Sequence, residues 1–193
     1  MKTIKRTVLV VVLMLGTLVN YANNSELKNV LDATKTKVVF KGTKKGQQLT
    51  IKDGNGVVLH FENVSKAGNL VKFFDFSKLK DGNYTLELEK DFEIVIKSIM
   101  VKGDNVVFNE DSKKIIFKPV IRNKENKLMI SKIAFDKKPS EIYIYYNDEV
   151  IFSETVKSDA ILNRIYSLDE DVKGSYTVVI RSNGRSFSND FEI

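Results

Sequence analysis

The sequence contains no cysteine, one histidine and two prolines among its 193 residues. The absence of cysteine excludes disulfide bonds, thiolate metal ligands, cysteine nucleophiles and a lipid-modified cysteine. Because His60 is the sole histidine, a zinc site built from three or four nitrogen or sulfur ligands is not expected. The chain must therefore obtain its stability from packing and strand pairing.

Catalytic motifs are also missing. A Ser-His-Asp triad would have to use His60, but there is no Gly-x-Ser-x-Gly elbow, and no glycine-rich phosphate loop occurs. His60 lies in an alternating run opposite Leu59 and Phe61, so we expect its side chain to face solvent from a strand. We predict a protein that is not an enzyme, with no catalytic residue and no cofactor. A small hydrolase with paired carboxylates is the distant alternative, because separation in space decides that mechanism.

Two acidic segments are candidates for a calcium site, which needs only oxygen ligands. The first, Asp53-Gly-Asn-Gly56, resembles the start of an EF-hand loop but lacks the later carboxylates, and its composition favours a β-hairpin turn. The second, 167–171, is the densest acidic cluster, yet the matching segment 77–81 of the repeat described below is basic. We predict no metal site.

The net charge of +6 gives little support for a nucleic-acid partner. Three of the 31 basic residues and no acidic residue lie within 1–22, so the rest of the chain has 28 basic and 25 acidic residues, a net charge of +3. This is an ordinary charge for solubility, and the lysine pairs lie beside turns rather than along a basic stripe. We therefore predict no nucleic-acid partner.

The N-terminus has the order of a secretory signal peptide: a basic segment (1–6), an apolar run (8–19) and a polar segment (20–24). The apolar run is shorter than the roughly 20 residues that a membrane-spanning helix needs. We predict a signal peptide at 1–22, cleaved after Ala22, and no membrane span after cleavage; an uncleaved anchor is the alternative. The protein is then secreted, periplasmic or on the surface of a Gram-negative bacterium. A chain without disulfides is compatible with this location.

After a predicted linker at 23–35, apolar and polar residues alternate, and β-branched and aromatic residues dominate each run. No segment has the period of a capped amphipathic helix, so the fold class is all-β. The expected strands are 36–41, 47–52, 57–62, 70–76, 83–89, 92–101, 105–109, 114–122, 127–134, 141–146, 149–156, 161–167, 175–182 and 185–193.

The strands form two similar sets, which indicates an internal repeat. Residues 49–53 correspond to 142–146, 57–64 to 150–156, and 76–88 to 168–180. The last pair shares Gly-x-Tyr-Thr-hydrophobic-x-hydrophobic, beginning at Gly82 and Gly174. The repeat predicts two modules, at 36–103 and 104–193. The alternative is that residues 105–122 pair with the first sheet.

The Gly-x-Tyr element predicts a tyrosine corner, in which Tyr84 and Tyr176 bury their rings and their hydroxyls cap the preceding loop. With these turns, residues 49–99 and 142–193 resemble short immunoglobulin-like domains of secreted Bacteroidetes proteins. They are more weakly similar to the C-terminal sorting domains of type IX secretion cargo. The resemblance implies two tandem immunoglobulin-like antiparallel β-sandwich modules after a signal peptide, and it transfers no functional residues.

Tyrosines on one predicted strand are the remaining functional signal. Alternation places Tyr143 and Tyr145 on one face, opposite Ile142, Ile144 and Tyr146. If the isoleucine face is core, Tyr143 and Tyr145 are free to stack on a sugar or a protein; ordinary cross-strand pairing is the alternative. We predict a non-catalytic protein that binds a protein or glycan of the cell envelope. The second hypothesis is a structural or assembly subunit that pairs through edge strands.

Overall fold

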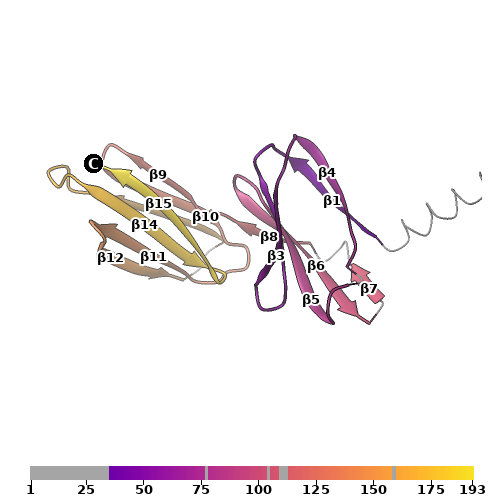
Figure 1. The fold of residues 1–193 in the computed structure, drawn as a ribbon. Coiled ribbons are helices and arrows are strands. Elements are labelled where there is room, and N and C mark those ends of the chain that lie inside the picture. Colours follow the sequence, from indigo (N-terminus) through magenta and orange to yellow (C-terminus); the bar gives the residue numbers. More distant parts are fainter. Residues whose placement is uncertain (1–34, 77, 104, 109–112, 158–159) are drawn as a thin grey trace, which may run out of the picture.

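The computed structural model describes residues 35–193, apart from 77, 104, 109–112 and 158–159 (Figure 1). The predicted signal peptide, and all but the last residue of the predicted linker, lie outside the described residues. Every regular element in the described part of the chain is a β-strand, which confirms the all-β fold class. A helix long and apolar enough to cross a membrane is not found among these residues.

The first module comprises the strands β1 (Thr36–Thr43), β2 (Gln48–Lys52), β3 (Val58–Asn63), β4 (Gly68–Phe74), β5 (Gly82–Glu89), β6 (Glu93–Lys102), β7 (Asn105–Phe108) and β8 (Lys114–Phe117). The second comprises β9 (Val120–Lys124), β10 (Lys127–Ile133), β11 (Ser140–Tyr146), β12 (Glu149–Val156), β13 (Ile161–Ser167), β14 (Ser175–Ser182) and β15 (Arg185–Glu192). Each expected strand has a counterpart here, except that 114–122 divides into β8 and β9 at Pro119, which has no amide hydrogen to donate to a sheet.

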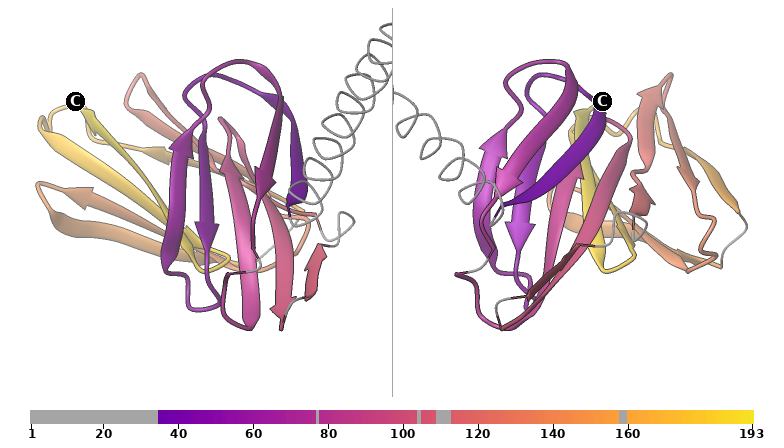
Figure 2. Two further views of the ribbon diagram at one scale, coloured as in Figure 1. Left: turned by 45° about the vertical axis from the view of Figure 1, so that its right-hand side comes forward. Right: turned by 90° about the vertical axis from the view of Figure 1, so that its right-hand side faces the viewer.

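The first module is a sandwich of two antiparallel sheets (Figure 2). The large sheet has the order β3-β2-β5-β6-β7, with β8 also paired to β6, and the small sheet is β1-β4. Inward residues of both sheets form one buried core, which includes Val38 and Phe40 from β1 and Leu49, Leu86 and Leu88 from the large sheet. Alternating apolar residues explain this arrangement, because one face of each strand is buried between the sheets.

The second module repeats this architecture. Its four-stranded sheet, β12-β11-β14-β15, has the same order as β3-β2-β5-β6, and its other sheet is β13-β10-β9. Leu128 and Ile130 from β10 pack against Ile142, Ile144 and Val178 from the four-stranded sheet. The shared strand order confirms two tandem immunoglobulin-like β-sandwich modules.

The strands between the two sets belong to the first sheet. β7 pairs with Ile99–Lys102 of β6, and β8 pairs with Glu93–Ile96 of the same strand. The sequence predicted that the second module starts at residue 104, with the pairing of residues 105–122 with the first sheet as the alternative. Residues 105–108 and 114–117 pair as in that alternative, whereas residues 120–122 belong to β9 and pair with β10. The reason is that alternation identifies a strand but not the sheet that it joins. A domain boundary near residues 100–120 stays a prediction.

Both tyrosine corners are present with matching geometry. The hydroxyl of Tyr84 donates a hydrogen bond to the carbonyl oxygen of Lys80 (2.7 Å), and that of Tyr176 donates to the carbonyl oxygen of Val172 (3.0 Å). Each ring is buried in the core of its own module. The predicted structural role of the Gly-x-Tyr element is therefore confirmed in both copies.

The modules contact each other through the outer face of the large sheet. Ile94, Ile96 and Ile116 form a small buried cluster there, and Phe187 of β15 packs against it. Beside this cluster, Arg185 from the start of β15 makes an ion pair with Glu87 of β5 (2.6 Å). The turn between β14 and β15 thereby places one end of the four-stranded sheet next to the first module.

Candidate binding face

The two predicted ligand-binding residues lie on the outer face of the four-stranded sheet of the second module. In β11, Ile142 and Ile144 are fully buried in the core, and the alternate residues Tyr143 and Tyr145 are half-buried on the opposite side. Tyr143 is paired across the sheet with Ser153 and Val179 rather than with another tyrosine. The predicted faces of this strand are correct, and cross-strand tyrosine pairing does not occur at Tyr143.

Tyr143 is held in place by charged neighbours on the same face. Its hydroxyl donates a hydrogen bond to Glu141 Oε2 (3.0 Å), and the guanidinium of Arg181 lies over its ring, 5.0 Å from the centroid. The hydrogen bond to Glu141 is the main cause that raises the pKa of Tyr143 above its ordinary value, so the hydroxyl stays protonated. The side chain therefore presents a fixed aromatic surface with a polar end.

A polar hollow of about 390 Å³ adjoins this row of side chains at the end nearest the first module. It is lined by Glu141 and Thr155 from neighbouring strands and by Arg181 and the β14–β15 turn. Glu141 and Arg181 are cross-strand partners, so they stand side by side on the face. Neither residue was predicted from the sequence, although alternation places Glu141 on the same face as Tyr143 and is sufficient to identify it.

The face thus combines tyrosine, arginine, carboxylate and hydroxyl groups on the outer side of one sheet. Tyrosine and arginine are enriched among residues that dominate protein interfaces, because each combines a large contact area with a hydrogen-bonding end. Hydroxyl groups of Ser153, Thr155 and Ser186 add donors and acceptors around the aromatic row. Chemically, this arrangement suits recognition of a surface rather than a reaction.

The sole histidine lies on the inward side of β3, but its side chain is still 42% exposed, so the prediction that His60 faces solvent is correct only in part. His60 pairs across the sheet with the buried Ile51 and so shares its inward face, leaving Leu59 and Phe61 exposed by 47% and 52%. Its ring meets Phe74 of the small sheet edge-on at 5.8 Å. Alternation predicted the strand but could not identify the face that the small sheet covers, because the apolar residues of β3 lie on its exposed side.

The acidic segments behave as turns. Asp53 Oδ1 accepts hydrogen bonds from the amides of Asn55 and Val57 (both 2.9 Å), which closes the hairpin between β2 and β3 as predicted. In the second cluster, Asp169 Oδ1 accepts from the amide of Asp171 (3.0 Å). Across the described ranges, no group of three or more histidine, aspartate or glutamate residues is arranged to hold a metal ion.

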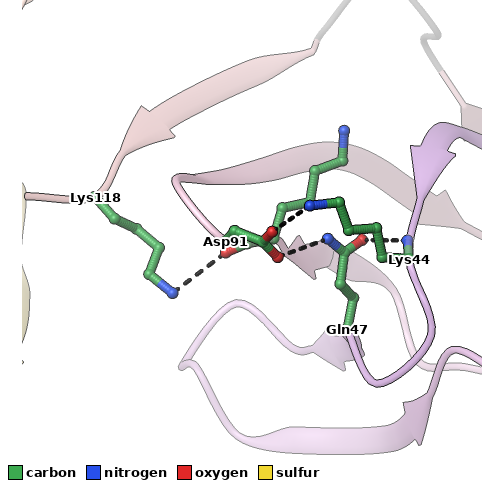
Figure 3. Close-up of polar contacts among 5 residues, drawn as sticks. Lys44, Gln47, Asp91 and Lys118 are labelled. Atoms are coloured by element: carbon green, nitrogen blue, oxygen red, sulfur yellow. Dashed lines mark hydrogen bonds and ion pairs between the residues drawn. The ribbon is translucent and has the colours of Figure 1, made fainter. Parts of the chain in front are cut away.

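A charged cluster at one end of the first module is a further polar site (Figure 3). Asp91 accepts hydrogen bonds from Lys44 Nζ (2.6 Å) and Gln47 Nε2 (3.2 Å), and Gln47 Oε1 accepts from the amide of Lys44 (2.9 Å). Lys118 Nζ reaches the carbonyl oxygen of Lys90 (3.2 Å) in the same turn. These groups satisfy one another and fasten the β1–β2 loop to the β5–β6 turn, so the cluster has a structural explanation.

No protein-family model and no curated protein matches the sequence. Among solved structures, the chain is similar to the human OSCAR ligand-binding domain, at 8% identity and a TM-score of 0.25 over 82% of this chain and 89% of that one. It is also similar to Drosophila OTK extracellular domains 3–5, at 10% identity and a TM-score of 0.26 over 82% of this chain and 91% of that one. A chain of the complex of Dpr2 Ig1-Ig2 with DIP-Theta Ig1-Ig3 matches at 17% identity and a TM-score of 0.28, over 81% of this chain and 58% of that one. Such values carry no argument about function.

Proposed function

We propose that this protein is a non-catalytic binding protein of the bacterial cell envelope, secreted to the periplasm or cell surface, and that its partner is another protein. The observation that carries the proposal is the outer face of β12-β11-β14-β15, where Tyr143, Tyr145, Glu141 and Arg181 stand together beside a polar hollow. A sheet face of this composition suits a protein surface, which covers many side chains at once.

The test compares the mature wild-type chain with a Y143S/Y145S variant in crosslinked recovery from the native envelope. We expect the wild type to recover one stoichiometric protein and the variant to lose it by about tenfold or more, since interface tyrosines commonly contribute 2 kcal/mol or more. Both side chains point away from the core, so the variant keeps the fold. Phe92→Ser, which changes an exposed aromatic residue of the first module, is the matched control. Equal recovery of the partner by wild type and variant contradicts the proposal. Selective binding to a glycan array would identify the partner as a glycan instead of a protein.

A second candidate function is assembly with further copies of the chain. Exposed apolar residues lie on two edge strands of the second module, with Val150, Ile151 and Phe152 on β12 and Ile161 and Ile165 on β13. Edge strands with apolar side chains are able to pair with another chain. The same crosslinking experiment distinguishes the candidates, because ladders of the chain itself indicate assembly and a different stoichiometric protein indicates binding.

Secretion is tested at the N-terminus of the protein made in its own cells. We expect the mature chain to begin at Asn23, because cleavage after Ala22 lies in the polar segment that follows the apolar run. Intact-mass measurement and N-terminal sequencing of the envelope fraction give the answer. A chain that retains Met1 in that fraction contradicts cleavage and supports an uncleaved anchor.

A further inference from the structure

Lys97 is a buried lysine with no counter-ion among the residues that the structure describes. It lies on the inward face of β6 between Val95 and Ile99, and only 8% of the residue is exposed. Its Nζ lies 5.6 Å from the ring centroid of Phe40 and 5.3 Å from that of Phe108. Within the described residues, no hydrogen bond or ion pair involves this ammonium group. Cation–π contacts offset only part of the cost of removing a charge from water.

This ammonium group borders a cavity of about 240 Å³ between β1 and β6. Three other lysines also line the cavity, Lys41, Lys90 and Lys113, and none of its lining residues in the described part of the chain is acidic. Lys90 is paired with Glu93 (3.0 Å), whereas Lys41 and Lys113 have no hydrogen bond or ion pair through their ammonium groups in the described part of the chain. The remaining lining residues are apolar: Val39, Phe40 and Val95.

The sandwich does not require a lysine at this place. Tyr84 pairs with Ile99 across β5 and β6, and Tyr176 pairs with Phe191 across β14 and β15, so the two registers can be superposed residue by residue. Two residues before Ile99 is Lys97, and two residues before Phe191 is Asn189, which is neutral and exposed. The second module therefore forms the shared strand order without a buried charge at this position, and it has no counterpart of β7, whose Phe108 lies against Lys97.

We propose that this cavity is a binding site for a small organic carboxylate with a compact apolar body. The anion makes an ion pair with Lys97 and is approached by Lys41 and Lys113 at the rim, and the apolar part lies against Phe40 and Val95. A charge-assisted hydrogen bond to a buried ammonium group is stronger than one between neutral groups. The volume equals that of about eight water molecules, so it admits one small ligand and not a folded partner. This site is separate from the binding face of the second module.

Benzoate is a suitable probe, with benzamide as the neutral molecule of the same shape. We expect benzoate to shift the backbone amide resonances of β1 and β6 in the mature wild-type chain and to raise its unfolding temperature, and benzamide to do neither. Lys97→Met keeps the length of the side chain and removes its charge, and we expect it to bind benzoate at least about tenfold more weakly. Lys66→Met, at an exposed lysine in the β3–β4 turn, is the matched control and keeps full affinity.

A second variant, K41Q/K113Q, changes only exposed lysines and so keeps the test valid if Lys97→Met does not fold. We expect it to weaken benzoate binding several-fold. Equal binding of benzoate and benzamide, or wild-type affinity in both variants, overturns the proposal. Binding of inorganic phosphate without binding of benzoate overturns the assignment to carboxylates.

Discussion

Tyr176→Ala is expected to lower the free energy of unfolding of the second module by about 3–5 kcal/mol, the usual cost of removing a buried aromatic ring. The ring is 2% exposed, stacks on Phe191 with centroids 5.6 Å apart, and lies 5.0 Å from the ring of Tyr146. Small domains have only about 5–15 kcal/mol of stability, so this variant brings the second module close to unfolding. Urea denaturation followed by NMR, which resolves the two modules, measures the loss.

Tyr176→Phe separates the ring from its hydroxyl. This variant keeps the stacking and loses only the hydrogen bond to the carbonyl oxygen of Val172, so we expect a loss of about 1 kcal/mol. Tyr84→Phe, which loses the bond to Lys80, is the matched change in the first module and is expected to have the same effect there. Equal losses for Tyr176→Ala and Tyr176→Phe would contradict a core role for the ring, and unequal losses at Tyr84 and Tyr176 on changing to Phe would contradict equivalent corners.

A requirement for glycine accompanies the second corner. Gly174 has a φ of +150°, and a Cβ atom at this position would lie 2.8 Å from Cε2 of Tyr146. The Tyr146 ring is held by its contact with Tyr176 and by a hydrogen bond from its hydroxyl to the carbonyl oxygen of Lys173 (2.9 Å). A side chain at position 174 would displace this ring, and the positive φ of both Gly174 and Gly82 gives a physical reason for glycine in the two copies of the element.

The sequence predicted the strands well because alternation and turn residues are local properties. Pairing is not local, and this is where the prediction departs from the structure. Val106 and Phe108 of β7 are partly buried against the first core, whereas their sequence gives only a short strand of unknown partner. For the same reason, the inward direction of His60 follows from its pairing with Ile51 and not from its own neighbours along the chain.

The candidate sites show the same limit. The outward direction of Tyr143 and Tyr145 follows from alternation with two isoleucines, so it could be predicted. Arg181 is 38 positions further along the chain and joins Tyr143 only through the register of β11 with β14. Lys97 is one more lysine in a lysine-rich sequence, and its burial depends on the small sheet that covers β6. Sites made by strand pairing therefore need the fold before they can be recognised.

Contact between the modules is expected to depend on Glu87 and on acid pH. The Glu87 side chain is 11% exposed and makes ion pairs with Arg185 of the second module (2.6 Å) and with Lys52 of its own sheet (2.7 Å). Burial raises the pKa of Glu87, but the hydrogen bonds and charges of Arg185 and Lys52 outweigh burial and hold this pKa below its ordinary value. A lowered pKa means that the ionised form stabilises the folded, docked arrangement.

The stabilisation by Glu87 is complete above the unfolded pKa of 4.5 and is lost as the pH falls through the lower folded pKa. We therefore expect the radius of gyration, measured by small-angle X-ray scattering, to increase as the pH falls below 4.5 and through the lower folded pKa, because the modules separate. Glu87→Gln is expected to separate them at neutral pH, with a loss of about 1–3 kcal/mol. This is less than for a fully buried pair, because Arg185 and Lys52 are each 25% exposed and regain water. Glu62→Gln, which breaks the ion pair to Lys72 within the first module, is the control and leaves the radius unchanged at neutral pH. A Glu87→Gln chain with the radius and acid response of the wild type would show that Ile94, Ile96, Ile116 and Phe187 hold the modules together without the ion pair.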